Sequence, residues 1–310
     1  MKIALFERPS TGGGLRAGVL VESGVVDASD VVRAEPGRPA QEMMEKLIDR
    51  FDEVRPALAE LEQRGSPLAL SEVRLRAPLP RPGKMICMIG NYWEHAQREA
   101  RPANFFLKSP EAIIGPGDTI RLPSYQASVF HHEAELGLVI KGPAKDVPAD
   151  RWREAIFGYT CFTDVSARGE GRVTAGAGSF MGKSFDTFAP IGPCITTADS
   201  IEDPNALHVQ YWVNGQTFHD YQTNDMEHRV PELISFISSF MTLRSGDVIA
   251  CGTNHEGLGP LQDGDVGEIE IEQIGRMSMH VVDPLKRTWE RSIYLGPGTT
   301  ARQAEASPST

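Results

Sequence analysis

The sequence predicts a mainly β fold with some α structure, built from mixed and mostly antiparallel strands. The first observation is that short apolar stretches of strand length recur along the chain between turns rich in glycine and proline. The second is that few segments space their apolar residues helically, whereas a doubly wound sheet needs a helix after almost every strand. The composition suits a large globular core, because 40% of the 310 residues are hydrophobic and 24% are charged.

Residues 1–80 are expected to form a small N-terminal α/β domain. Its sheet is predicted from three apolar stretches separated by glycine-containing turns, at Lys2–Phe6, Arg16–Val21 and Val25–Val26. Residues 39–63 follow another pattern, in which apolar residues recur at helical spacing, at Met44, Leu47, Ile48, Phe51 and Val54. This pattern predicts one amphipathic helix or two short ones. The proline-rich run that follows, APLPRPGK, is typical of a connector, so we place the domain boundary near residue 80.

Residues 81–295 are expected to form the catalytic domain, in which strands dominate. The strands are predicted at Met85–Ile89, Glu135–Ile140, Phe157–Thr163, His208–Val213, Val248–Ala250 and Glu268–Ile274. One helix is predicted over residues 231–241, with an apolar stripe formed by Leu233, Ile234, Phe236, Ile237 and Phe240. The tail, residues 296–310, lacks large apolar side chains and is expected to be disordered.

The charge pattern excludes some partners and locations. The net charge of −11 and the lack of a clustered basic face argue against a nucleic-acid partner. A local basic pocket that binds a small anion is still compatible with this charge. No apolar run reaches the length of a membrane span, and the N-terminus lacks the apolar segment of a signal peptide. The four cysteines lie far apart in apolar settings, at Cys87, Cys161, Cys194 and Cys251. We therefore expect reduced core cysteines in a cytoplasmic protein.

A pair of carboxylates marks a candidate site. Glu133 and Glu135 lead into an apolar strand, and alternate residues of a strand share a face, so their Cα atoms should lie about 6.5 to 7 Å apart. Asp164 closes another apolar strand and could add a third carboxylate from across the sheet. Three oxygen donors suit a hard cation such as Mg²⁺ or Mn²⁺ better than zinc. On spacing alone, a solvated edge strand with Asp164 capping a turn is the favoured interpretation, because a Glu-x-Glu pattern is common.

A family resemblance strengthens the metal interpretation. The strings HHEAELGLVI, GYTCFTDVSARG, GKSFDTFAPIGP and SGDVIACGT, followed by a glycine-rich GLGP, occur in the order typical of the fumarylacetoacetate hydrolase family. The resemblance extends over residues 84–282, and NYWEHA and FFLKSP resemble further family segments. It implies a mixed β-sandwich roll preceded by a small N-terminal module, a homodimer, and one Mg²⁺ or Mn²⁺ per subunit bound by Glu133, Glu135 and Asp164.

The same resemblance implies roles for further residues. Lys183 would lie beside the metal, as a donor to an oxyanion or as electrostatic support for the carboxylates. Tyr159, Gln222 and Thr253 match positions that line the substrate pocket, although core packing explains Tyr159 equally well. Arg168, four residues after Asp164, has a guanidinium suited to a substrate carboxylate or to a carboxylate that binds the metal.

Two departures from the family pattern concern the remaining candidates. The family carries a His and a Glu on a short helix after an Asn-Tyr pair, but Arg98 occupies the acidic position here. Helical spacing then leaves His95 and Glu99 as the expected catalytic pair. In the segment GTNHEGLGP the family has proline after the threonine and a loop one residue shorter, so His255 and Glu256 are expected to contact substrate or to be exposed loop residues.

The function that the resemblance implies is metal-dependent hydrolysis of a carbon–carbon bond in a small 1,3-diketo or acylpyruvate-type acid. Such an oxo acid chelates the ion, and chelation stabilises the enolate that forms when the neighbouring carbon bond breaks. An isomerase or decarboxylase of a 2-oxo or 2-hydroxymuconate-type acid in aromatic catabolism would pass through the same enolate. A non-catalytic, metal-stabilised binding protein is the third alternative, because a fold does not fix a function.

Overall fold

The computed structural model describes residues 1–11, 14–35, 37–96, 98–169, 181–291 and 294–295. The segments that precede the predicted boundary are β1 (Lys2–Glu7), β2 (Arg16–Val21), β3 (Gly24–Asp27), α1 (Ala40–Asp49), α2 (Phe51–Arg64) and β4 (Arg74–Arg76). The strands of the next part are β5 (Met85–Met88), β6 (Phe105–Lys108), β7 (Ile113–Ile114), β8 (Thr119–Arg121), β9 (Val129–His131), β10 (Ala134–Ile140), β11 (Ile156–Thr163) and β12 (Ser166–Arg168).

The remaining strands and helices complete the chain. They are β13 (Ala189–Thr197), β14 (His208–Val213), β15 (Gln216–Gln222), α3 (Val230–Phe240), β16 (Val248–Ala250), β17 (Glu256–Leu258), β18 (Val266–Ile271), β19 (Gly275–Val282) and β20 (Tyr294–Leu295). Short 3₁₀ turns connect several of them, including η4 (Ala149–Ala155), η6 (Met181–Lys183) and η8 (Thr223–Asp225). The predicted disordered tail, residues 296–310, lies outside the described residues.

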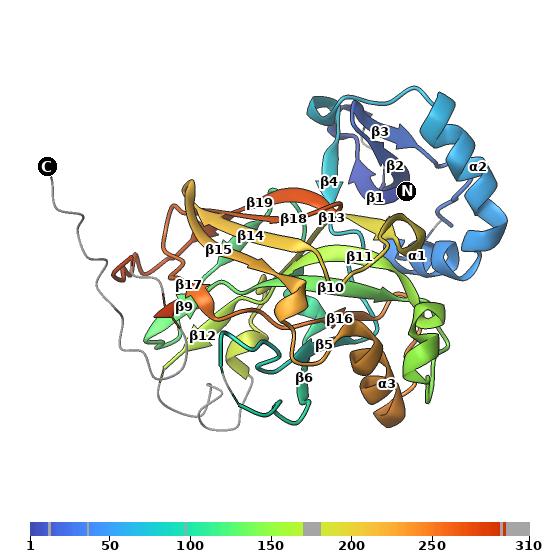
Figure 1. Cartoon of the computed structure of the whole chain (residues 1–310). Helices are drawn as coiled ribbons and strands as arrows, with labels where there is room; N and C mark the ends of the chain where they lie inside the picture. Colours follow the sequence, from blue (N-terminus) through green and yellow to red (C-terminus); the bar gives the residue numbers. More distant parts are fainter. Residues whose placement is uncertain (12–13, 36, 97, 170–180, 292–293, 296–310) are drawn as a thin grey trace, which may run out of the picture.

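Two sheets form the body of the protein. The larger has the strand order β3-β2-β1-β13-β11-β10-β16-β5-β6, and the smaller has the order β15-β14-β18-β19-β8. Figure 1 shows the smaller sheet lying over the β10–β11–β13 region of the larger one, with α3 on the opposite side. The side chains of Leu136, Phe162, Tyr211 and Ile269, two from each sheet, are fully buried. The predicted mainly β fold is confirmed.

The N-terminal strands continue the larger sheet. Lys2 and Ile3 of β1 pair with Thr196 and Ile195 of β13, so β1 joins the two parts of the chain. The division into domains at residue 80 stays a prediction. Residues 39–63 form two helices, because the backbone leaves helical values at Arg50, where φ is −106° and ψ is 17°.

The helix α3 buries only part of its predicted apolar stripe. Leu233, Ile234 and Ile237 are fully buried, and each contributes about 1.5 to 3 kcal/mol to the free energy of unfolding. Phe240 is 63% exposed and stacks edge-on with Phe105 of β6. The stripe prediction was therefore wrong for Phe240, because this side of the helix end faces the sheet edge and solvent rather than the core.

One predicted strand has different bounds. The segment Glu268–Ile274 was expected to be continuous, but β18 ends at Ile271 and β19 begins at Gly275. Gln273 has a φ of 65°, in the left-handed region that a tight turn uses and a strand does not. The two strands form a hairpin that the apolar pattern hides, because Ile274 is buried within the turn.

A parallel pair of strands brings two distant loops together. β16 lies between β10 and β5; it is antiparallel to β10 and parallel to β5. Because parallel strands end at the same edge of a sheet, the segments after Met88 and after Ala250 leave side by side. Asn91 bridges them, since its Nδ2 donates to the carbonyl oxygens of Cys251 (2.9 Å) and His228 (3.1 Å).

Two further features of the structure bear on the sequence-based expectations. All four cysteines are buried and none of them forms a disulfide, as predicted. Among the described residues, no helix has both the length and the apolar character needed to cross a membrane.

Candidate metal centre

Three carboxylates converge at one end of β10 and β11, two central strands of the larger sheet. Glu133, Glu135 and Asp164 are buried, and one carboxylate oxygen from each lies within 4.8 Å of the other two. Oxygen ligands around one octahedral Mg²⁺, each about 2.0 to 2.1 Å from the ion, lie about 3 to 4 Å apart. Small side-chain adjustments would therefore let all three oxygens bind one ion.

The pairing of β10 with β11 explains this convergence. Ala134 pairs with Thr163, and the amide of Asp164 donates to the carbonyl of Glu133 over 2.9 Å. Glu133 and Asp164 are thus direct neighbours across the two strands. Glu133 precedes β10 by one residue, and Glu135 is the second residue of this strand. Their carboxylates still reach the same site.

Three cations surround the carboxylates. The Nζ of Lys183 lies 2.7 Å from an oxygen of Glu133 and 2.8 Å from an oxygen of Asp164. The Nζ of Lys108, which is fully buried in β6, contacts the other oxygen of Asp164, and Arg168 contacts Glu133. The predicted placement of Lys183 beside the carboxylates agrees with this geometry. Arg168 makes one of its two predicted contacts, with a candidate metal ligand.

The pKa values of the two glutamates shift in opposite directions. Burial raises the pKa of Glu133, but Lys183 and Arg168 outweigh burial and hold it below its ordinary value. Burial, followed by the charges of Asp164 and Glu133, raises the pKa of Glu135 well above its ordinary value. A negative charge on Glu135 is therefore unfavourable in the absence of a divalent ion. Such an ion, placed between the three carboxylate oxygens, would stabilise that charge.

The loop after β16 contributes a further contact to the cluster. The amide of Gly252 donates to an oxygen of Glu135 over 2.7 Å, and its φ of +86° lies in the region that favours glycine. Thr253, next along the chain, is 3% exposed. Thr253 thus follows a residue that contacts the cluster, and its role in the substrate pocket stays a prediction.

The other two predicted pocket residues lie elsewhere. Tyr159 is fully buried in β11, where strand alternation directs its side chain to the face opposite Asp164. Gln222 is exposed at the end of β15, whereas its neighbour Tyr221 is buried and donates to the carbonyl of Ala134 over 2.5 Å. A direct substrate contact by Tyr159 or Gln222 stays a prediction.

The structure does not bring His95 and Glu99 together. The side chain of His95 is 87% exposed, and its Nε2 lies 3.4 Å from Glu256. The described residues of the segment 91–100 form turns rather than the expected helix, and Glu99 is exposed. His255 and Glu256, in contrast, are both partly buried, so neither is a fully exposed loop residue. Their contact with substrate remains a prediction.

Two residues of this region were missed by the sequence-based prediction. Lys108 lies on the same face of β6 as the buried Phe106, so strand alternation could have marked it as an internal lysine that needs a carboxylate. Glu94 gave no such signal, because its carboxylate is placed by a turn in which its own φ is 53°.

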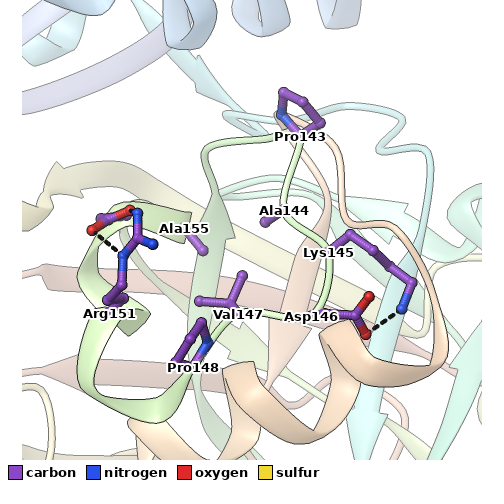
Figure 2. Close-up of a pocket in the computed structure, with 9 residues that line it drawn as sticks. Pro143, Ala144, Lys145, Asp146, Val147, Pro148, Arg151 and Ala155 are labelled. Atoms are coloured by element: carbon purple, nitrogen blue, oxygen red, sulfur yellow. Dashed lines mark hydrogen bonds and ion pairs between the residues drawn. The ribbon is translucent and has the colours of Figure 1, made fainter.

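A separate surface hollow of about 280 Å³ lies where η4 meets α3 (Figure 2). Its charged side chains pair with each other: Lys145 with Asp146 over 2.5 Å, and Arg151 with Glu154 over 2.6 Å. None of the three carboxylates of the candidate metal centre lines it. We therefore assign the chemistry to the carboxylate cluster and use this hollow as a source of control variants.

Metal removal and return should change the melting temperature. Binding at 100 times the Kd adds about 2.7 kcal/mol to the free energy of unfolding, which corresponds to a rise of about 5 °C for a chain of this size. We expect this rise when Mn²⁺ or Mg²⁺ is added to chelator-treated protein, as measured by differential scanning calorimetry. An unchanged melting temperature in millimolar concentrations of both ions would contradict the metal assignment.

Comparison with known proteins places this geometry in context. A family model described as the fumarylacetoacetate (FAA) hydrolase C-terminal region matches residues 84–282. A crystal structure of maleylpyruvate hydrolase from Sphingobium sp. SYK-6, in complex with a manganese(II) ion and pyruvate, is 35% identical in sequence. It superimposes with a TM-score of 0.80 and covers 91% of this chain and 99% of that chain.

Two further relatives carry different activities in their names. The 2-hydroxyhepta-2,4-diene-1,7-dioate isomerase of Mycobacterium marinum is 31% identical, with a TM-score of 0.69 over 92% of this chain and 99% of that one. The mitochondrial oxaloacetate tautomerase FAHD2A of Bos taurus is 35% identical over 298 residues, covering 91% of this chain and 92% of the relative. Similarity of this degree therefore extends to hydrolase, isomerase and tautomerase activities.

Proposed function

This chain belongs to the fumarylacetoacetate hydrolase family, and from that premise we propose that it is a metal-dependent hydrolase of a carbon–carbon bond in a small acylpyruvate-type acid. The observation that carries the proposal is the buried cluster of Glu133, Glu135 and Asp164 with Lys183 beside it. Isomerisation and tautomerisation are the alternatives, because relatives with those names also match over 92% and 91% of this chain. Mg²⁺ and Mn²⁺ are the proposed ions.

The charges around the cluster support a dianionic substrate. Lys108, Lys183 and Arg168 balance the three carboxylates when all of them are ionised. A divalent ion would then leave an excess of two positive charges in a largely buried site. A dicarboxylic oxo acid carries two negative charges and would neutralise this excess, whereas a monoanion would leave one positive charge uncompensated.

A divalent ion held by the three carboxylates would polarise the oxo group of a chelating substrate and stabilise the enolate. The chain's own residues supply the remaining steps. Lys183 has three N–H donors and two carboxylate partners among the described residues, so one N–H can bind the oxyanion formed when water attacks the remote carbonyl. Collapse of that oxyanion breaks the carbon–carbon bond and releases an acid and the enolate of pyruvate.

Product analysis separates the candidate reactions. We expect maleylpyruvate or fumarylpyruvate, incubated with the Mn²⁺-loaded protein, to lose its diketone ultraviolet absorbance and release one pyruvate and one second acid per molecule. Chelator should abolish the release, and added Mn²⁺ should restore it. A spectral change without fragments would instead support isomerisation or tautomerisation, and released carbon dioxide would support decarboxylation; either result would contradict the hydrolase proposal.

A further inference from the structure

A histidine and a glutamate form a tight pair outside the carboxylate cluster. The Nδ1 of His255 lies 2.5 Å from the carboxylate of Glu94, and the same oxygen accepts the backbone N–H of His255 over 3.0 Å. The Glu94 side chain is 7% exposed and that of His255 is 22% exposed. A histidine that donates from Nδ1 to a buried carboxylate presents the lone pair of Nε2, as the base of a catalytic triad does.

Asp225 holds Glu94 directly and His255 through its chain neighbour Asn254. The carboxylate oxygen Oδ2 of Asp225 accepts the backbone N–H of Glu94 over 3.2 Å and the side-chain amide of Asn254 over 3.0 Å. The carbonyl of Asp225 accepts the amide of Trp93 over 3.0 Å. The segment after β5 and the loop after β16 are therefore joined at one anchor, which sets the position of the imidazole.

His255 lies on the loop that contacts the candidate metal centre through Gly252. His255 is three residues beyond Gly252, whose amide binds the Glu135 carboxylate. Burial raises the pKa of Glu133, and a charged His255 is among the groups that lower it, so the imidazole is within electrostatic range of that carboxylate. No hydrogen bond of the described residues engages the Nε2 of His255. That nitrogen is available to a bound substrate.

His95, the histidine at the family position, is placed less favourably. Its contact with Glu256 is 3.4 Å long, and the two side chains are 87% and 34% exposed, so solvent screens the pair. Arg98, at the family's acidic position, instead binds Glu227, whose side chain is fully buried and also holds Arg101. Because Arg98 and Arg101 both pair with Glu227, the segment after His95 is held in a conformation in which its own carboxylate does not orient that histidine.

We propose that His255, oriented by Glu94, is the proton-transfer residue of this enzyme in place of His95. The proposal rests on the proposed oxo-acid chemistry at the carboxylate cluster. In its simplest step, the Nε2 lone pair takes a proton from the carbon next to the oxo group. The C–H electron pair becomes the C=C bond of the enolate, and the C=O π pair moves onto the oxo oxygen. The imidazolium, whose charge Glu94 balances, exchanges its Nε2 proton with solvent and returns a solvent proton to the carbon in the reverse step.

Deuterium exchange of pyruvate tests this step without requiring any bond cleavage. Wild-type protein with Mn²⁺ in D₂O should catalyse loss of the pyruvate methyl proton signal, followed by NMR after the metal is removed. His255→Asn keeps a side-chain N–H near the position of Nδ1 but deletes Nε2, and we expect it to slow exchange at least 100-fold. The matched variant His95→Asn should stay within threefold of wild type, and Glu94→Gln should fall between them.

Two measurements distinguish catalysis from structure. The affinity for Mn²⁺, measured by calorimetry, should change less than threefold in His255→Asn. In the metal-free protein, the Nδ1 proton of His255 should give a low-field resonance that Glu94→Gln removes. Exchange within threefold of wild type in His255→Asn, a 100-fold loss in His95→Asn, loss of Mn²⁺ affinity, or no exchange by wild type would each overturn the proposal.

The proposed hydrolysis can fail separately. If wild type releases no pyruvate from any diketo acid but exchanges pyruvate protons through His255, the hydrolase assignment is wrong and the role of His255 stands. If pyruvate is released at equal rates by wild type and His255→Asn, the hydrolase assignment stands and the role of His255 is wrong.

Discussion

Asp164→Asn is expected to weaken Mn²⁺ binding at least about 100-fold and to lower kcat/KM at least about 1,000-fold, equivalent to roughly 4 kcal/mol of lost transition-state stabilisation. The carboxylate is one of only three acidic ligands of the proposed ion among the described residues. An amide oxygen is a weaker ligand for a hard cation. The substitution also removes the charge that Lys108 and Lys183 contact, so two cations would then oppose the ion.

The experiment on Asp164→Asn must distinguish loss of the metal from unfolding of the protein. Lys108 is fully buried, so losing its charged partner should cost about 3 kcal/mol of unfolding free energy. Circular dichroism at the assay temperature would show whether the variant is folded, and calorimetry would give its Mn²⁺ affinity. Asp146→Asn is a matched control, because Asp146 lies in the separate surface hollow and its φ of 51° suits asparagine. Undiminished turnover by Asp164→Asn would refute the metal centre.

The three acidic ligands could be predicted from sequence because strand alternation and order along the chain determine their placement. Glu133 and Glu135 are two residues apart at the start of β10, and Asp164 directly follows β11. When β10 and β11 pair antiparallel in this register, the start of β10 lies beside the end of β11. The carboxylates at these two positions are then neighbours. The family resemblance supplied the evidence that they pair. Local spacing alone favoured a solvated edge strand.

The pairing of Glu94 with His255 could not be predicted in the same way. It depends on β5 and β16 being parallel neighbours, although they are far apart in the sequence. Asn91, which follows β5, is 160 residues from Cys251, which follows β16. The sequence pattern indicated mostly antiparallel strands and gave no sign of this contact. It depends also on a turn at Glu94 in place of the expected helix, which directs the carboxylate inward and leaves His95 outside.

Lys183→Met tests the cation that touches two of the three carboxylates. In the absence of metal, the lysine neutralises repulsion between Glu133 and Asp164, so its loss should destabilise the metal-free protein by about 3 kcal/mol. A divalent ion would replace that positive charge. We therefore expect Mn²⁺ to bind at least as tightly as in wild type and to restore most of the melting temperature.

Turnover, unlike Mn²⁺ affinity and melting temperature, should not recover when the metal is returned. This difference makes the variant informative. Loss of a preorganised donor to a developing oxyanion costs about 100-fold to 1,000-fold in kcat, and returning the metal supplies no such donor. The expected result is a folded, Mn²⁺-loaded protein with kcat reduced by this factor and little change in KM. Lys145→Met, in the separate surface hollow, is the matched control and should retain wild-type kcat.

If Lys183→Met kept its kcat within threefold, the lysine would only balance charge, and the oxyanion would need another donor. If wild-type protein bound Mn²⁺ and pyruvate but turned over no oxo acid, with ligand affinity unchanged in Lys183→Met, the binding-protein alternative would replace the enzyme.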